Sequence, residues 1–234
     1  MMNNINLIVI DTVSFDLKIA ISIGEKEFFI DKKDYSNQNV ESLMPIIDTI
    51  FKEQNLFPNI ITNIAVCVGP GSFTGIRVGL ATAFGLIFGK NIDIIGFSQF
   101  DIYKALLKDK IDCTIIPIID AKKDSVYTCF ISDKISDKIE DEKNLVGECL
   151  TINELSDRLN SIDGKVYFTG KDFLSLKDRI VGKKDIIYEY CYIDDYSSKD
   201  MFYVIKKRIS NGENGILEPL YLRKSDAEIS LLNR

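Results

Sequence analysis

Between Val68 and Leu80 an apolar strand runs directly into a glycine-rich turn and then into a helix of small residues, VGPGSFTGIRVGL. Glycines at 69, 71 and 75 allow positive φ angles and let backbone amides converge at the helix N-terminus, where the helix dipole favours an anion. The spacing matches neither G-x-G-x-x-G nor G-x-x-x-x-G-K-[ST], and no lysine stands at the P-loop position. A phosphate cradle and a tight strand-to-helix turn are therefore both open interpretations.

The chain contains no histidine. This absence removes the Ser-His and Cys-His nucleophile pairs and the commonest metal ligand, so Ser72 has no partner that could activate it as a nucleophile. The five cysteines are widely spaced and form no C-x-x-C pair, which is typical of free thiols in a reducing cytosol. We therefore predict no catalytic residue, no metal site and a cytoplasmic protein.

The order of apolar segments predicts an α/β fold. Short strands over 5–11, 15–23 and 25–31 are followed by an amphipathic helix from about 40 to 54, with Asn39 as its candidate N-cap. A strand over 60–68, a helix over 74–89 and a strand over 92–98 complete the element order of a ribonuclease-H-like lobe.

A second, less regular round of the same pattern begins near Cys113. The strand over 114–120 ends in Asp120 as the first strand of the chain ends in Asp11, and a strand over 125–131 follows. We expect an N-terminal lobe over 1–110 and a divergent C-terminal lobe over 111–234, with a C-terminal tail able to pack back on the first lobe. Thr151 and Glu154 predict a capping box at a helix start.

The helix over 74–89 is apolar on all sides. Small residues gather on one side, and we expect close packing or turn roles for Gly69, Gly71, Gly75, Gly79 and Ala83. Larger residues occupy the other side. One sheet covers only one face of such a helix, so either the second lobe or another protein must cover the rest. Small residues also let two helix axes approach closely.

Asp11 and Thr12 stand where the first strand gives way to a turn. A carboxylate at this place can hold a nucleotide-bound Mg²⁺, but aspartate is equally a good turn residue, and the residues leave both roles open. We interpret Asp120, in the corresponding place of the second half, as structural.

Charge and hydropathy exclude two classes of partner. The net charge of −6 and the lack of a Lys/Arg-rich stripe argue against a free-standing nucleic-acid binder. The N-terminus has no basic region before its apolar run, and no uncharged run approaches the roughly 20 residues of a membrane span, so we expect neither a signal peptide nor a membrane segment.

Four segments in order along the chain carry a family resemblance. IDT at 10–12, GPGSFTGIRVGLATAFGL at 69–86, PIIDAKKDSVY at 117–127 and PLYLRKSDAE at 219–228 together resemble the TsaB (YeaZ) family. The resemblance implies the actin-like, sugar-kinase-like ATPase fold with two ribonuclease-H-like lobes. It also implies work with a catalytic paralogue, TsaD, and an ATPase, TsaE, which transfer a threonylcarbamoyl group to the adenosine beside the anticodon of tRNAs that read ANN codons.

The same resemblance implies a non-catalytic scaffold, because TsaD holds its metal with a His-x-x-x-His pair that this chain lacks. It implies that the helices over 40–54 and 74–89 bind TsaD, or a second copy of the chain when TsaD is absent, and that tRNA is reached only through the complex. It implies no cofactor for the isolated chain, with ATP or ADP and Mg²⁺ possible in the complex. The candidate interface residues are Met44, Ile47, Phe51, Arg77, Leu80, Phe84 and Phe88.

Two alternatives stand beside this hypothesis. The first is an ATPase or small-molecule kinase of the same fold, which would use Asp11 on Mg²⁺ and the 69–75 loop, including Ser72, on phosphate. The second is a peptidase, against which the missing histidine and the absence of a zinc motif argue.

Overall fold

The computed structural model describes residues 5–14, 16–33, 42–110, 112–132, 145–180, 188–190, 195–213 and 215–224. The chain divides into two compact units. The first comprises Met1–Gln99 and Ser197–Tyr221, and the second comprises Phe100–Tyr196 and Leu222–Arg234. Each unit combines helices with a strand framework, so the predicted α/β class is confirmed. The predicted cap at Asn39, the thiol of Cys191 and the charged stretch 133–144 lie outside the described residues.

The first unit is built on a five-stranded sheet in the order β3-β2-β1-β4-β5. Its strands are β1 (Leu7–Asp11), β2 (Leu17–Ile23), β3 (Lys26–Lys32), β4 (Asn63–Gly69) and β5 (Asp93–Ser98). β1 to β3 form an antiparallel meander, and β4 pairs parallel to both β1 and β5. β1 and β4 are buried along their whole length, as strands covered on both faces must be. This is the ribonuclease-H-like order that the sequence predicts.

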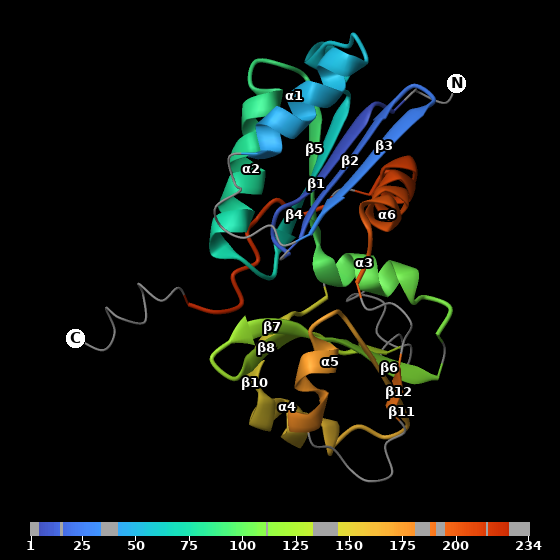
Figure 1. Cartoon of the computed structure of the whole chain (residues 1–234). Coiled ribbons are helices and arrows are strands. Elements are labelled where there is room, and N and C mark those ends of the chain that lie inside the picture. Colours follow the sequence, from blue (N-terminus) through green and yellow to red (C-terminus); the bar gives the residue numbers. More distant parts are fainter. Residues whose placement is uncertain are drawn as a thin grey trace, which may run out of the picture. The chain divides into compact units, whose positions relative to one another are not determined.

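Two helices cover opposite faces of this sheet (Figure 1). The ring of Phe29 on β3 packs against Phe202 of α6 (Ser198–Ser210), with centroids 5.5 Å apart. Val66, on the other face, packs against Gly79 of α2 (Phe73–Ile87). The pairing register puts these contacts on opposite faces, because Phe29 shares a row with Ala20, Val9 and Ala65, one residue out of step with Val66.

The first unit also contains α1 (Leu43–Glu53) and the 3₁₀ turn η2 (Pro58–Ile60), whereas α3 (Gln99–Leu106) belongs to the second unit except for its first residue. α1 buries Leu43, Ile47 and Phe51, which recur at helical spacing, and begins after Ser42.

Helix α6 is fastened to β3 by polar contacts as well as by aromatic packing. Asp31 accepts hydrogen bonds from the backbone amide of Ser198 (2.8 Å) and from its hydroxyl (2.7 Å), which satisfies an amide of the first turn of the helix. Farther along, Glu27 accepts from the Tyr203 hydroxyl (2.9 Å) and the Lys206 ammonium (3.0 Å). A helix that lies late in the sequence thus completes the first unit.

The second unit repeats the strand order in an interrupted form. Its first strand is split at Ile118 into β6 (Cys113–Pro117) and β7 (Ile119–Lys122), and its second is split into β8 (Ser125–Thr128) and β9 (Ile131–Ser132). One sheet has the order β10-β8-β7 and the other β12-β11-β6-β9, so the two halves of each broken strand belong to different sheets. If the halves are joined, the order is again 3-2-1-4-5.

The other elements of the second unit are β10 (Glu148–Thr151), α4 (Ile152–Leu159), β11 (Lys165–Thr169), α5 (Phe173–Leu176), the 3₁₀ turn η4 (Lys177–Arg179) and β12 (Tyr188–Tyr190). Leu155 and Leu159 of α4 pack with Ile116, Val166 and Phe168 in its main core. The predicted capping box is confirmed, because Thr151 and Glu154 exchange side-chain and backbone hydrogen bonds at the start of α4. Among the helices that the structure describes, none is long and apolar enough to cross a membrane.

The contacts of Glu27 with α6 predict that the stability of the protein depends on pH. Burial disfavours the charged form of Glu27, but the hydrogen bonds from Lys206 and Tyr203 outweigh this effect and lower the pKa of Glu27. The stabilisation that Glu27 provides is therefore complete at pH values above the ordinary pKa of a glutamate, and it is lost as the pH falls through the lowered pKa of Glu27. We expect Glu27→Gln to lower the free energy of unfolding at pH 7 by about 0.5–1 kcal/mol.

Urea denaturation at pH 7 and pH 3 measures this effect. The difference in the free energy of unfolding between the wild type and Glu27→Gln should be smaller at pH 3 than at pH 7. Glu25→Gln, at the exposed turn of the same hairpin, should leave the free energy of unfolding unchanged at both pH values. A difference of the same size at both pH values would show that the charge of Glu27 is not what holds α6.

Candidate functional site

The glycine-rich turn packs closely against the C-terminal segment and against the turn after β1. The Gly69–Pro70 peptide bond is cis, and Gly69 and Gly71 have φ values of 127° and 149°. A Cβ on Gly69 would lie 2.9 Å from the carbonyl oxygen of Leu220, and one on Gly71 would lie 2.7 Å from Cγ1 of Val13. Both positions therefore require glycine for conformation and for space.

The first turn of α2 is capped from within the chain. The Ser72 side chain accepts a hydrogen bond from the amide of Gly75 (3.1 Å), and the amide of Ser72 donates to the carbonyl of Val13 (3.2 Å). Two of the amides that a phosphate cradle would use thus already have protein acceptors. This geometry favours the strand-to-helix turn over the phosphate site, and it makes Ser72 an N-cap.

Asp11 organises the turn on which α2 rests. Its side chain is fully buried, and Oδ1 accepts from the amides of Val13 (2.8 Å) and Ser14 (3.2 Å) while Oδ2 accepts from the Ser14 hydroxyl (2.9 Å). The hydroxyl of the next residue, Thr12, donates to the carbonyl of Gly75 at 2.7 Å. Asp11 and Thr12 together therefore join the end of β1 to the start of α2.

The small-residue side of α2 faces the interior of the first unit. A Cβ on Gly75 would clash with the carbonyl oxygen of Thr12, and one on Gly79 would lie 2.6 Å from Oγ1 of Thr12 and 3.2 Å from Val66. Ala83 continues this buried side. The close approach that these residues permit is made to the Thr12 turn and to β4 of the same chain.

The opposite side of α2 is exposed. Its outermost residues follow one another at intervals of three and four, as one face of a helix requires, and we call them the α2 outer stripe: Thr74, Arg77, Ala81, Phe84 and Phe88. Phe84 is 49% exposed and Phe88, at the C-cap, 87%. Large exposed aromatic residues in line on one helix face are typical of a protein-binding surface.

The structure separates the seven candidate interface residues into two groups. Met44, Arg77, Phe84 and Phe88 are exposed, and Met44 is 45% accessible. Ile47, Phe51 and Leu80 are buried, with Leu80 only 8% exposed. The three buried residues pack α1 and α2 against the interior, and the four exposed residues are accessible to another protein.

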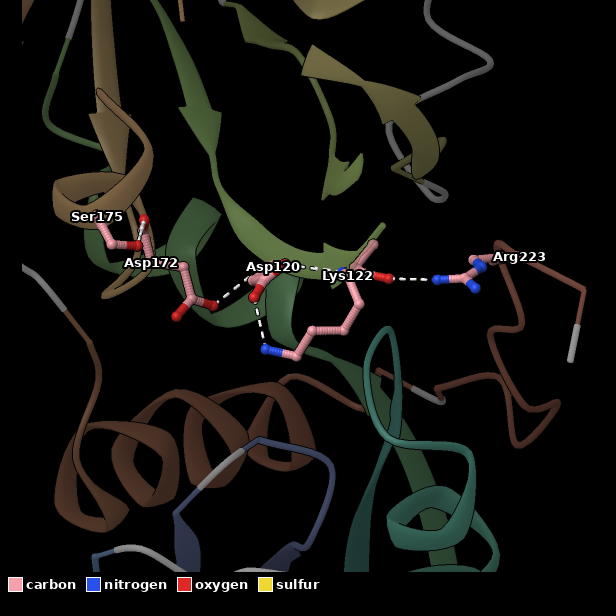
Figure 2. Close-up of polar contacts among 6 residues, drawn as sticks. Asp120, Lys122, Asp172, Ser175 and Arg223 are labelled. Carbon is pink, nitrogen blue, oxygen red and sulfur yellow. Dashed lines mark hydrogen bonds and ion pairs between the residues drawn. The ribbon is translucent and has the colours of Figure 1, made fainter. Parts of the chain in front are cut away.

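The turn that corresponds to Asp11 in the second unit also satisfies its own carboxylate (Figure 2). Asp120 accepts from the backbone amide (2.7 Å) and the ammonium (2.6 Å) of Lys122, and its own amide donates to Asp172 (2.9 Å). Arg223 donates to the carbonyl of Ala121 beside it. Within the described parts of the chain, no three His, Cys, Asp or Glu side chains gather as metal ligands.

Comparison with known proteins identifies the family. The family described as "tRNA N6-adenosine threonylcarbamoyltransferase", TsaD, matches residues 33–231, most of the chain. The Bacillus subtilis tRNA threonylcarbamoyladenosine biosynthesis protein TsaB is 26% identical over 229 residues, which cover 95% of this chain and 96% of that protein. This chain belongs to the TsaD family, as a TsaB (YeaZ) member.

Further relatives agree with this assignment. The Haemophilus influenzae protein of the same name is 30% identical over 135 residues, which cover 54% of this chain and 53% of that protein. The solved structure of YeaZ from Pseudomonas aeruginosa has a TM-score of 0.68 at 17% identity and covers 93% of this chain and all of that one. The chain therefore has the fold of YeaZ.

The contact of the C-terminal segment with the glycine-rich turn and α2 was not predicted from individual residues. The segment 219–228 resembles the family in sequence, but it has no periodic pattern that indicates where it packs. The structure puts Leu220 against Gly69 and stacks the Tyr221 ring on Phe73 at the start of α2. A glycine at position 69 indicates that another backbone segment approaches closely, but nothing in the sequence indicates which segment.

The packing of α2 predicts opposite effects for three glycine-to-alanine changes in one helix. Gly75→Ala and Gly79→Ala place a Cβ into Thr12 and should each lower the free energy of unfolding by about 1–3 kcal/mol. Gly85, which has open space around it, should gain about 0.5–1 kcal/mol as alanine from helix propensity alone. Thermal and urea denaturation measure the stability of the three variants relative to the wild type. A stabilising effect of Gly75→Ala would contradict the close packing of α2 against Thr12.

Proposed function

We propose that the chain is a non-catalytic scaffold subunit in the biosynthesis of threonylcarbamoyladenosine in tRNA. In this role it binds the catalytic paralogue TsaD and works with TsaE, and so supports threonylcarbamoyl transfer to the adenosine beside the anticodon of tRNAs that read ANN codons. Membership of the TsaD family and the printed function of the TsaB relatives support the pathway.

Two features of the residues support a non-catalytic role. The sequence has no histidine, so it lacks the residues with which the TsaD paralogue is expected to hold a metal. In addition, Asp11 and Ser72, the best candidates for nucleotide chemistry, use their side-chain oxygens to build the turn between β1 and α2. We propose that the isolated chain needs no cofactor and that any ATP or ADP with Mg²⁺ belongs to the complex.

The observation that carries the proposal is the α2 outer stripe. Phe84 and Phe88 expose aromatic surface on a helix whose other side is already packed on its own sheet. Aromatic residues on a firmly seated helix lose little conformational entropy when a partner covers them, which is typical of interface hot spots. Met44, exposed on α1, adds apolar surface.

TsaD is the proposed occupant because this chain matches the family of the transferase itself. A paralogue of the same fold has counterparts of α1 and α2, and two such helix pairs can pack as a bundle. We propose that a second copy of the chain occupies the surface when TsaD is absent. The net charge of −6 leaves tRNA binding to the complex.

The test mixes the purified chain with TsaD of the same organism and measures the dissociation constant and the mass of the complex by light scattering. Phe84→Glu and Phe88→Glu should each stay folded and weaken binding about 100-fold or more, because an unpaired carboxylate would be buried. Leu174→Glu, at 45% exposure on α5 of the second unit, is the matched control and should bind as the wild type does.

Activity supplies the second readout. With threonylcarbamoyl-adenylate as the donor, TsaD and TsaE should modify tRNA only when the chain is added, and Phe84→Glu should fail to support the reaction. Normal binding and activity of both phenylalanine variants would overturn the proposed surface. Mg²⁺-dependent ATP binding by the isolated chain, abolished in Asp11→Ala, would instead indicate a nucleotide enzyme.

A further inference from the structure

The C-terminal segment places an aromatic residue at the start of the α2 outer stripe. The Tyr221 ring stacks on Phe73 with centroids 4.8 Å apart and 9° between the ring planes. The amide of the preceding Leu220 donates to the carbonyl of Val68 at 2.8 Å, at the end of β4. Tyr221 is still 41% exposed, so a firmly held phenol group faces solvent beside α2.

Tyr221 in turn orients Arg77. Nε of Arg77 donates to the Tyr221 hydroxyl at 3.3 Å, and the guanidinium carbon lies 5.9 Å from the ring centroid. In the part of the chain that the structure describes, this tyrosine is the one side chain with which the guanidinium forms a hydrogen bond or a cation–π contact, and no carboxylate pairs with it. α2 itself carries no acidic residue. Among the described residues, no hydrogen bond is formed by the two terminal nitrogens of Arg77.

We propose that Arg77, held by Tyr221, binds an aspartate or glutamate side chain of the partner protein on the α2 outer stripe. The inference rests on the proposed function and deepens it, because it adds the C-terminal segment to the interface and names the chemistry of the contact. A guanidinium matches a carboxylate in a two-point hydrogen-bonded pair, which a lysine does not reproduce.

The position of Arg77 in the stripe supports this pairing. Arg77 precedes Ala81 by one helical turn and Phe84 by two, so a partner helix that covers the two phenylalanines along α2 also reaches the arginine. A cation that a partner covers must be paired there, because an uncompensated buried charge is costly. Its fixed orientation reduces the entropy lost on binding. The stripe thus combines an apolar end for affinity with a charged end for orientation.

The experiment measures the dissociation constant with TsaD of the same organism between 50 and about 500 mM NaCl, where screening separates charge pairs from apolar contacts. Arg77→Ala should weaken binding about 10-fold or more at low salt and flatten the salt dependence. Arg77→Lys should keep part of the salt dependence but not the affinity. Tyr221→Phe, which keeps the stacked ring and loses the hydroxyl, should weaken binding about 3–5-fold.

Two comparisons make the test decisive. Arg179→Ala, an exposed arginine of the second unit, should leave affinity and salt dependence unchanged. Reversal of the charge with Arg77→Glu should be rescued by a lysine at one acidic position of TsaD. If Phe84→Glu abolishes binding while the Arg77 and Tyr221 variants bind as the wild type does at every salt concentration, this inference is overturned and the proposed function stands. If Phe84→Glu also binds normally, the docking surface itself is wrong.

Discussion

The close contact between α2 and the turn after β1 is the constraint on which the first unit depends. Gly75 and Gly79 lack side chains where Thr12 lies against the helix, and the Thr12 hydroxyl donates to the helix backbone at the same place. Asp11 holds this turn with both carboxylate oxygens. Because the backbone of α2 lies directly against the backbone and the side chain of Thr12, this contact sets both the distance of α2 from the sheet and the rotation of α2 about its own axis.

That rotation decides which side of α2 is exposed. With Gly75, Gly79 and Ala83 turned to the interior, Phe84 and Phe88 must face outward. The glycine-rich segment 69–75 resembles a phosphate-binding loop in composition, but here it positions the start of α2. The amides of Ser72 and Gly75 form hydrogen bonds within the chain. The fold thus leaves one face of α2 exposed, which is consistent with the proposed scaffold role.

Much of this fold follows from local sequence. The buried apolar runs that predict strands at 5–11 and 60–68 correspond to β1 and β4, and the helix predicted over 74–89 is α2 at Phe73–Ile87. The helical wheel shows that α2 is apolar all round but cannot say which side is core, because that depends on Thr12, over sixty residues earlier. The docking of α6 on β3 likewise depends on Asp31 and Ser198, a pairing across 167 positions that no periodicity reveals.

The most direct test of the account asks whether TsaD covers the exposed side of α2. Ala81→Cys places a small thiol in the middle of the outer stripe, and its rate of alkylation can be measured with and without TsaD, against the wild-type chain and Leu174→Cys. The account predicts that TsaD slows alkylation at position 81 about 10-fold or more and leaves position 174 unchanged, as complete burial at an interface core requires. Equal rates at position 81 in the free chain and in a formed complex would contradict it.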